Sequence, residues 1–191
     1  NLNSVTAKVE QLSQPFTNTN AEIRLAEQDI IFEEFTTKLG DVSAIAQGKI
    51  NLETGYDLNA EIQPTAIANL LKAADLEASE IPISGKVKAN IAITGGLENP
   101  QFDITAESTE STKIDQINLQ RFQSKVSVNG NNLAIENFQA TPQTGGEISA
   151  QGKVNLTEAQ TVDLDVQLKD ISGEMIRPYQ PDLPSDLGIL N

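Results

Sequence analysis

The chain alternates apolar and polar residues with a period of two over most of its length. In KVKANIAI, at positions 86–93, Val87, Ile91 and Ile93 fall on one set of alternate positions, and lysine and asparagine fall on the other. Successive side chains of a β-strand point to opposite faces, so this period is typical of strands. The segments GYDLNAEI, TVDLDVQL, AEIRLA and FDITA follow the same rule. The pattern predicts a mainly β, antiparallel sheet with one apolar and one polar face.

Two segments depart from this alternation. PTAIANLLKAADLEA, at 64–78, spaces its aliphatic residues as a helix does, and Pro64 stands early enough to be tolerated. It predicts a helix that is best formed near 65–74. KDISGEMIRP, at 169–178, predicts a shorter helix that ends at Pro178, and the proline-rich residues 179–191 predict a loop or a severed linker.

One short phrase occurs twice: AQGKINL at 46–52 returns as AQGKVNL at 150–156. Upstream, Ile23 corresponds to Val126 and Phe35 to Phe138 without a gap. The weaker echo SGKVKANIAITG lies between the copies. Residues 1–191 are therefore interpreted as an excised fragment of a repeat array, with repeat A over about 20–80, an intervening β segment over about 84–120, and repeat B over about 121–178. The glycine before the lysine is expected to bend each strand at the rim of the sheet.

Composition narrows the possible functions. Lys+Arg 13 against Asp+Glu 27 gives a net charge of −14, which repels phosphate backbones and argues against binding nucleic acid or anionic membrane surfaces. Disorder is the other interpretation of so acidic a chain, and the regular alternation argues against it. Cys 0 excludes disulfides and thiolate metal sites. The apolar runs are too short for a membrane-spanning helix or a signal peptide.

The residues offer little for catalysis. His 0 removes the commonest general base, and there is no GxSxG turn or phosphate-binding glycine loop. Asp163 and Asp165 could touch a calcium ion, but a solvated strand face explains them better, because a calcium site needs six or more oxygen ligands. Glu33 and Glu34 are adjacent and are expected to point to opposite faces. We expect no catalytic residue, no metal site and no cofactor, and hence no enzyme.

The apolar face has two interpretations, a filled core or a partly open trough for an apolar ligand. In the second, Ile67, Leu70 and Leu71 of the predicted helix form a cap or plug. The trough would then be lined from the apolar rows by Ile23, Leu25, Ile50, Leu52, Leu58, Ile62, Val87, Ile91, Ile93, Phe102, Ile104, Val126, Val128, Ile135, Val154, Leu164 and Val166.

The segment GKVKANIAITGGLENPQFDI, at 85–104, resembles the recurrent G-x-V-x-A-x-I-x-I-x-G-x-L-x-N-P-x-F phrase of the TamB and AsmA-like proteins. The segment 133–156 resembles the β-repeat of the same family, and IIFEEF…AQGKINL is its earlier copy. The resemblance implies a curved antiparallel sheet rolled into a taco-like half-barrel with a hydrophobic interior groove, plus one or two short helices.

The same resemblance implies a function. Family members are anchored in the inner membrane and cross the periplasm, or the chloroplast envelope in plant relatives. They are linked to phospholipid movement to the outer membrane and to outer-membrane protein assembly with an Omp85-type barrel. The expected ligands are phospholipid acyl chains, and any barrel partner would meet other parts of the parent protein. The alternative is a non-catalytic spacer or surface β-solenoid with a filled core.

Overall fold

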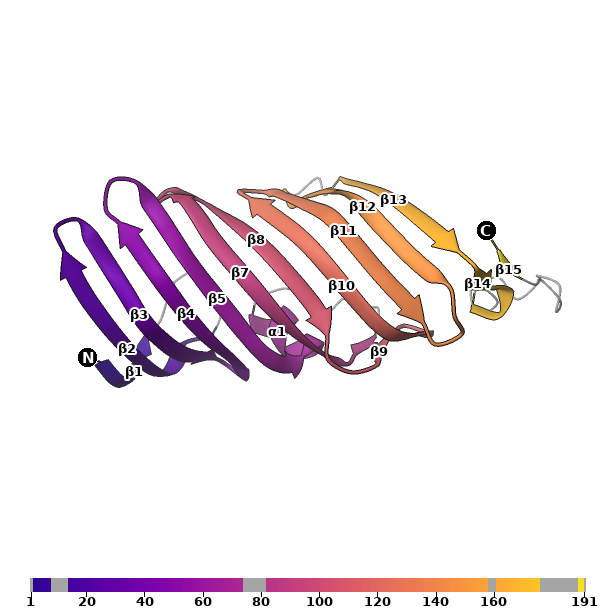
Figure 1. The fold of residues 1–191 in the computed structure, drawn as a ribbon, viewed down its shortest axis with the longest axis horizontal. Coiled ribbons are helices and arrows are strands. Elements are labelled where there is room, and N and C mark those ends of the chain that lie inside the picture. The colour runs from indigo at the N-terminus through magenta and orange to yellow at the C-terminus, as the bar shows by residue number, and fades with distance from the viewer. Residues whose placement is uncertain (1, 8–13, 74–81, 158–160, 176–188, 191) are drawn as a thin grey trace.

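The computed structural model describes residues 2–7, 14–73, 82–157, 161–175 and 189–190. Their fold is mainly β, as predicted: a thirteen-stranded antiparallel sheet that stays open rather than closing into a barrel (Figure 1). The first half comprises β1 Leu2–Ala7, β2 Phe16–Ala26, β3 Asp29–Leu39, β4 Val42–Asn51, β5 Gly55–Ala66, α1 Ile67–Ala73, β6 Ile83–Ser84 and β7 Lys86–Gly96.

The second half continues the same sheet. It comprises β8 Asn99–Ser108, β9 Thr112–Ile114, β10 Ile117–Asn129, β11 Asn132–Pro142, β12 Glu147–Asn155 and β13 Val162–Lys169, then β14 Ile171–Ser172, the 3-10 turn η1 Gly173–Met175 and β15 Ile189–Leu190. The main path runs from β1 to β13 in chain order, and β6 and β9 form a short side pair joined to β10. Neighbouring strands are joined by short turns, so almost every pairing is local in sequence.

Each repeat contains the same β-bulge. In β3, Phe32 pairs with Gly48 and Phe35 pairs with Ala46, so Glu33 and Glu34 together face one residue of β4. In β11, Ile135 pairs with Gly152 and Phe138 with Ala150. A bulge bends its strand and increases the local twist. It also moves the apolar positions from even to odd numbers, so Glu33 and Glu34 both lie off the apolar face and the prediction of opposite faces was wrong.

The repeated phrase is explained by contacts that recur in both copies. Gly48 has φ +128°, and a Cβ placed there would overlap the Asp57 carbonyl oxygen and lie 2.9 Å from the Cα of Leu58. Gly152 approaches Asp163 and Leu164 in the same way. Both glycines lie inside strands opposite a bulge, not at the rim of the sheet as predicted, because the bulged partner brings the next strand close.

The end of the phrase closes the turn. The side-chain Oδ1 of Asn51 accepts hydrogen bonds from the N–H groups of Glu53 and Thr54, each at 2.9 Å. Asn155 Oδ1 accepts the N–H of Thr157 at 2.9 Å. The leucine N–H groups donate to the preceding hairpin, Leu52 to the Gln28 carbonyl at 2.9 Å and Leu156 to the Asn131 carbonyl at 2.7 Å. The phrase therefore encodes one strand-to-turn unit twice.

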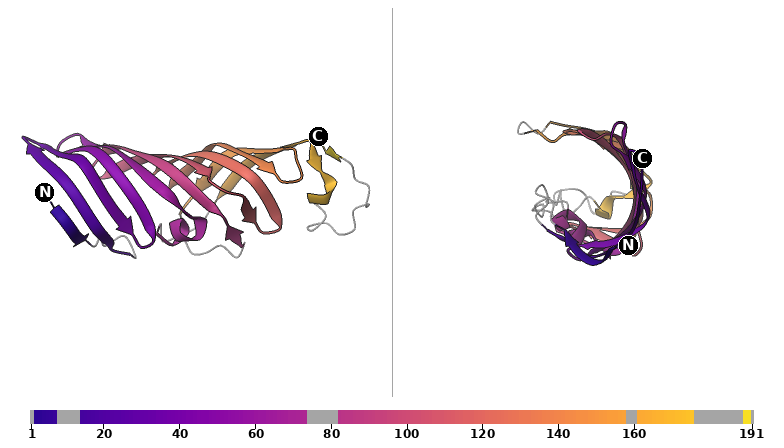
Figure 2. Two further views of the ribbon diagram at one scale, coloured as in Figure 1. Left: turned by 60° about the horizontal axis from the view of Figure 1, so that its bottom comes forward. Right: turned by 90° about the vertical axis from the view of Figure 1, so that its left-hand side faces the viewer.

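Seen along its long axis, the sheet has a C-shaped section with α1 inside the C (Figure 2). Leu70 of α1 packs against a cluster that includes Ile62 and Ala89. These residues belong to the apolar set of positions, so the apolar face is the concave one and the polar face is the convex one. The bulges supply the bending that this curvature requires.

The predicted helix is shorter than its sequence pattern. α1 spans Ile67–Ala73, and Pro64 belongs to β5, where the pairing with β7 shifts register between Ile62 and Thr65. A proline is tolerated at such a bulge because no ladder hydrogen bond is required there. Residues 74–78 of the predicted helix lie outside the described residues.

The C-terminal predictions need two corrections. The helix predicted over 169–178 is reduced to η1, because Lys169 ends β13 and Ile171–Ser172 forms β14. The loop predicted over 179–191 contains β15, whose Ile189 and Leu190 pair with β14. Residues 176–188, between these elements, lie outside the part of the chain that the structure describes.

Replacing Gly48 with alanine tests the bulge. We expect Gly48→Ala to lower the free energy of unfolding by about 2 kcal/mol or more, because φ +128° and the overlap with Asp57 are both unfavourable for a side chain. Gly96→Ala is the matched control, since a Cβ there meets nothing within 4 Å, and it should change stability by less than about 1 kcal/mol. Urea unfolding measures both, and equal losses would contradict the account.

Candidate functional site

The concave face carries two rows of mostly aliphatic side chains that cross ten strands, from β2 to β13. Cross-strand pairing links each residue of a row to the next. The first row is Ile23, Phe32, Gly48, Leu58, Ile93, Phe102, Val128, Leu133, Val154 and Val162. The second row is Ala21, Phe35, Ala46, Ala60, Ile91, Ile104, Val126, Ile135, Gly152 and Leu164.

Eleven of the seventeen residues predicted to line a trough stand in these two rows. Leu25 and Ile50 lie beside the first row, and Ile62, Val87 and Val166 lie beyond the second row on the same face. Leu52 is the exception, because β4 ends at Asn51 and Leu52 belongs to the exposed turn that follows. Their sharing of a face follows from the register, whereas their role as a lining remains a prediction.

The sequence prediction omitted residues next to the bulges. Phe32, Phe35, Leu133 and Phe138 all belong to the concave face. The rings of Phe32 and Phe35 meet edge to face with centroids 5.9 Å apart. Simple alternation fails at two consecutive polar residues, and the signal that could have identified these positions was the repeat itself, which aligns Phe35 with Phe138.

Most of the concave face is half-buried rather than sealed. Exposure is highest towards two places, Leu25 at the β2–β3 turn, which is 76% exposed, and β13, where Val162 is 60% and Val166 54% exposed. The second row contains alanine and glycine at Ala46, Ala60 and Gly152, where small residues leave room on the inner side of a curved sheet. The described part of the chain places no second sheet over this face.

The helix α1 covers one patch of the concave face. Its Ala73 is buried with Val42, Ile62 and Ala89, and Leu70 packs against them. Ile67 and Leu71 are half-buried. A seven-residue helix is too short to be stable alone, so packing holds it in place. The helix therefore covers part of the face near β4, β5 and β7, and its role as a cap or plug of a groove stays a prediction.

One polar pair lies among the apolar rows. The hydroxyls of Thr19 and Thr37 are buried and hydrogen-bonded to each other at 2.8 Å. Because each hydroxyl satisfies the other, the pair adds no unpaired polar group to the apolar face.

The convex face is polar and crossed by ion pairs. Lys88 Nζ lies 2.6 Å from Glu107 Oε1, and Lys125 Nζ lies 2.7 Å from Glu136 Oε2. The hydrogen bond to Glu107 raises the pKa of Lys88, and that from Lys125 lowers the pKa of Glu136. These pairs are exposed, so each contributes little to stability, and they mark this face as the solvated one.

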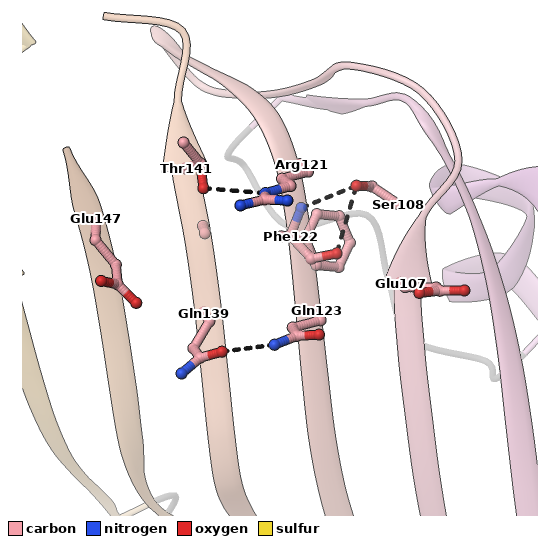
Figure 3. A pocket seen from close by; sticks show the side chains of 9 residues that line it. Glu107, Ser108, Arg121, Phe122, Gln123, Gln139, Thr141 and Glu147 are labelled. Carbon is pink, nitrogen blue, oxygen red and sulfur yellow. Dashed lines mark hydrogen bonds between the residues drawn. The ribbon is translucent and has the colours of Figure 1, made fainter. Parts of the chain in front are cut away.

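A hollow of about 320 Å³ lies on the polar side between β8, β10, β11 and β12 (Figure 3). Its polar side chains bond to one another across strands: Gln123 donates to Gln139, and Arg121 Nε donates to Thr141 Oγ1 at 3.3 Å. The glutamate Glu107 is already paired with Lys88. The hollow holds no buried ionisable group to bind a ligand or perform chemistry.

Among the described residues there is no group of three acidic, histidine or cysteine side chains that could hold a metal ion. Nor does any described helix have the length and apolarity needed to cross a bilayer. Comparison with protein-family models, with characterised proteins and with solved structures finds no match to this chain. The concave apolar face is therefore the candidate site on its geometry alone.

Charging the α1 contact tests whether the helix covers the sheet. Leu70→Asp should lower the free energy of unfolding by about 2 kcal/mol or more, because it places a carboxylate against Ile62 and Ala89. Ala68→Asp, on the exposed side of the same helix, is the control and should cost well under half as much. Thermal and urea unfolding compare the two variants, and equal stability would mean that α1 covers nothing.

Proposed function

We propose that this chain is a segment of an envelope protein of the TamB and AsmA-like type, and that its concave face holds and conducts phospholipid acyl chains towards the outer membrane. In this proposal the parent protein is anchored in the inner membrane and spans the periplasm. Support for outer-membrane protein assembly would come through an Omp85-type barrel that contacts other parts of the parent.

The observation that carries the proposal is the continuity of the two apolar rows. From Ile23 to Val162 and from Ala21 to Leu164, no charged residue interrupts either row across ten strands. Burying apolar surface is favourable by roughly 25 cal/mol per Å², so a half-exposed strip of this kind favours an apolar ligand over water. An acyl chain matches the strip because it is apolar along its whole length.

The length of the strip supports conduction rather than a single binding site. Ten strands about 4.8 Å apart place the ends of a row about 43 Å from each other along the sheet. The acyl chains of one leaflet extend about 15 Å, half of a hydrocarbon core of about 30 Å. A bound chain would thus occupy about a third of the strip, and neighbouring positions along it offer similar contacts.

The polar convex face fits the same proposal. Cross-strand pairs such as Lys88–Glu107 and the net charge of −14 keep the outer surface hydrated and repel anionic bilayers. A segment that crosses an aqueous space needs such an outer surface, and only its inner face needs to be apolar.

The filled-core spacer is the runner-up. A spacer would need its apolar face covered, as in a solenoid or a sandwich. Within the described residues, α1 covers only the patch around Val42, Ile62 and Ala89, and β13 stays exposed on its apolar side. These observations favour the open trough.

A photo-crosslinking side chain tests the proposal. Introduced in place of Ile93 and incubated with vesicles of zwitterionic phospholipid, it should capture lipid several-fold more than the same group in place of Thr94. Ile93 lies on the concave face and Thr94 is its exposed neighbour on the convex face. Zwitterionic vesicles avoid repulsion by the acidic chain.

Two results would count against the proposal. Equal capture at both positions would mean that lipid does not distinguish the faces. Absence of capture at Ile93 in a folded protein, checked by its unfolding curve, would favour the filled-core spacer.

A further inference from the structure

The outer edge of β13 is an open strand edge. Within the described chain β13 pairs only with β12, and every residue from Thr161 to Asp170 is exposed. Its four apolar residues continue the concave face, at exposures of 60% for Val162, 45% for Leu164, 54% for Val166 and 37% for Leu168. An open edge of this kind presents unpaired backbone N–H and C=O groups to any chain that can pair with it.

The backbone groups that point outwards can be identified from the pairing with β12. Asn155 N–H donates to the Thr161 carbonyl at 2.9 Å, so residues 155 and 161 form a hydrogen-bonded pair. Hydrogen-bonded and non-hydrogen-bonded pairs alternate in an antiparallel ladder. The odd-numbered residues of β13 therefore bond to β12, and Val162, Leu164, Val166 and Leu168 direct their N–H and C=O groups outwards.

The other repeat shows what this edge accepts. β5 is the counterpart of β13, since Gly48 pairs with Leu58 in the first copy and Gly152 with Leu164 in the second. The free side of β5 is covered by β7 in antiparallel pairing, with Leu58 opposite Ile93. The corresponding side of β13 is thus a position where this sheet accepts a further antiparallel strand.

The edge lacks the usual protection against pairing. Strand edges are commonly protected by proline, bulges or inward-pointing charges. β13 has no proline, glycine or register shift, and its charged residues lie on the polar face. The opposite edge of the sheet differs, because β1 shifts register twice against β2 between Leu2 and Ala7. A regular edge is the better template for a new strand.

The β13 sequence is complementary to itself in antiparallel pairing. With Val166 opposite Val166, Leu164 faces Leu168, Asp165 faces Gln167, and Asp163 faces Lys169 twice. Moving the axis to Asp165 would oppose two aspartates. Moving it to Gln167 would place Asp163 opposite Ile171, which is fully buried. One register is therefore favoured by charge and by shape.

We propose that two copies of this chain pair through their β13 edges, antiparallel, about a two-fold axis at Val166. The pairing joins two sheets into one and makes their concave apolar faces continuous. It depends on the edge geometry and on the charge pattern of β13, and not on the proposed lipid function.

Cysteine crosslinking tests the register, because the chain has Cys 0 and so no background reaction. Asp165 and Gln167 would form a non-hydrogen-bonded pair with Cα atoms about 4.5 Å apart, within the range of about 4.4–6.8 Å that a disulfide spans. A mixture of the single variants Asp165→Cys and Gln167→Cys should therefore crosslink several-fold faster than either variant alone. Fastest crosslinking of Asp165→Cys alone, or of Gln167→Cys alone, would overturn the assigned register.

Sedimentation over a wide concentration range tests the assembly itself. The native chain should pass from monomer to dimer and stop there. Val166→Pro should stay monomeric and folded, because the Val166 N–H points to the open edge, where proline is tolerated in a strand. Val166→Thr keeps that N–H and should still dimerise.

Rescue by charge exchange separates pairing from general association. Asp163→Lys should weaken the dimer, and the double variant Asp163→Lys/Lys169→Asp should restore it. A native chain that stays monomeric at all concentrations would overturn the proposal. Mass that keeps growing beyond the dimer would also overturn it, since head-to-tail pairing of β13 with β1 gives an open polymer.

Discussion

Strand bulges keep the apolar side chains of this open sheet on a single face while the sheet bends. A strand that curves without a bulge keeps strict alternation, and one that gains a residue without compensation turns its remaining apolar side chains to the wrong face. In β3 and β11 the extra glutamate is placed opposite a glycine, Gly48 or Gly152, where the neighbouring backbone approaches closely. Curvature and the continuity of the apolar rows therefore have a common origin.

This constraint also explains the thin core. A curved single sheet buries few residues fully, and the fully covered positions gather where α1 meets Val42, Ile62 and Ala89. The remaining stability comes from an uninterrupted ladder of local antiparallel pairs and from half-burial of the concave rows. A fold of this kind retains an exposed apolar strip, which is unusual for a protein without an apolar ligand or partner.

Alternation identified the strands and the apolar face because its period is the period of the strand itself. Ile91, Ile93, Leu58 and Val126 needed no other information. The bulge residues were missed because Glu33 and Glu34 interrupt the alternation, and whether two polar neighbours form a bulge depends on the partner strand. The length of α1 could not be read from Pro64, since a proline is compatible with a helix start and with a shifted strand register. Curvature depends on all the pairings together.

The account depends most on the claim that the concave face accepts acyl chains. Native mass spectrometry of the chain purified without detergent from membrane-containing cells measures this directly. The account predicts masses that exceed the protein by one or more phospholipids, and loss of these adducts when Leu58 on the concave face is replaced by arginine, but not when the convex residue Asn59 is replaced in the same way. A folded native chain that carries no lipid would contradict it.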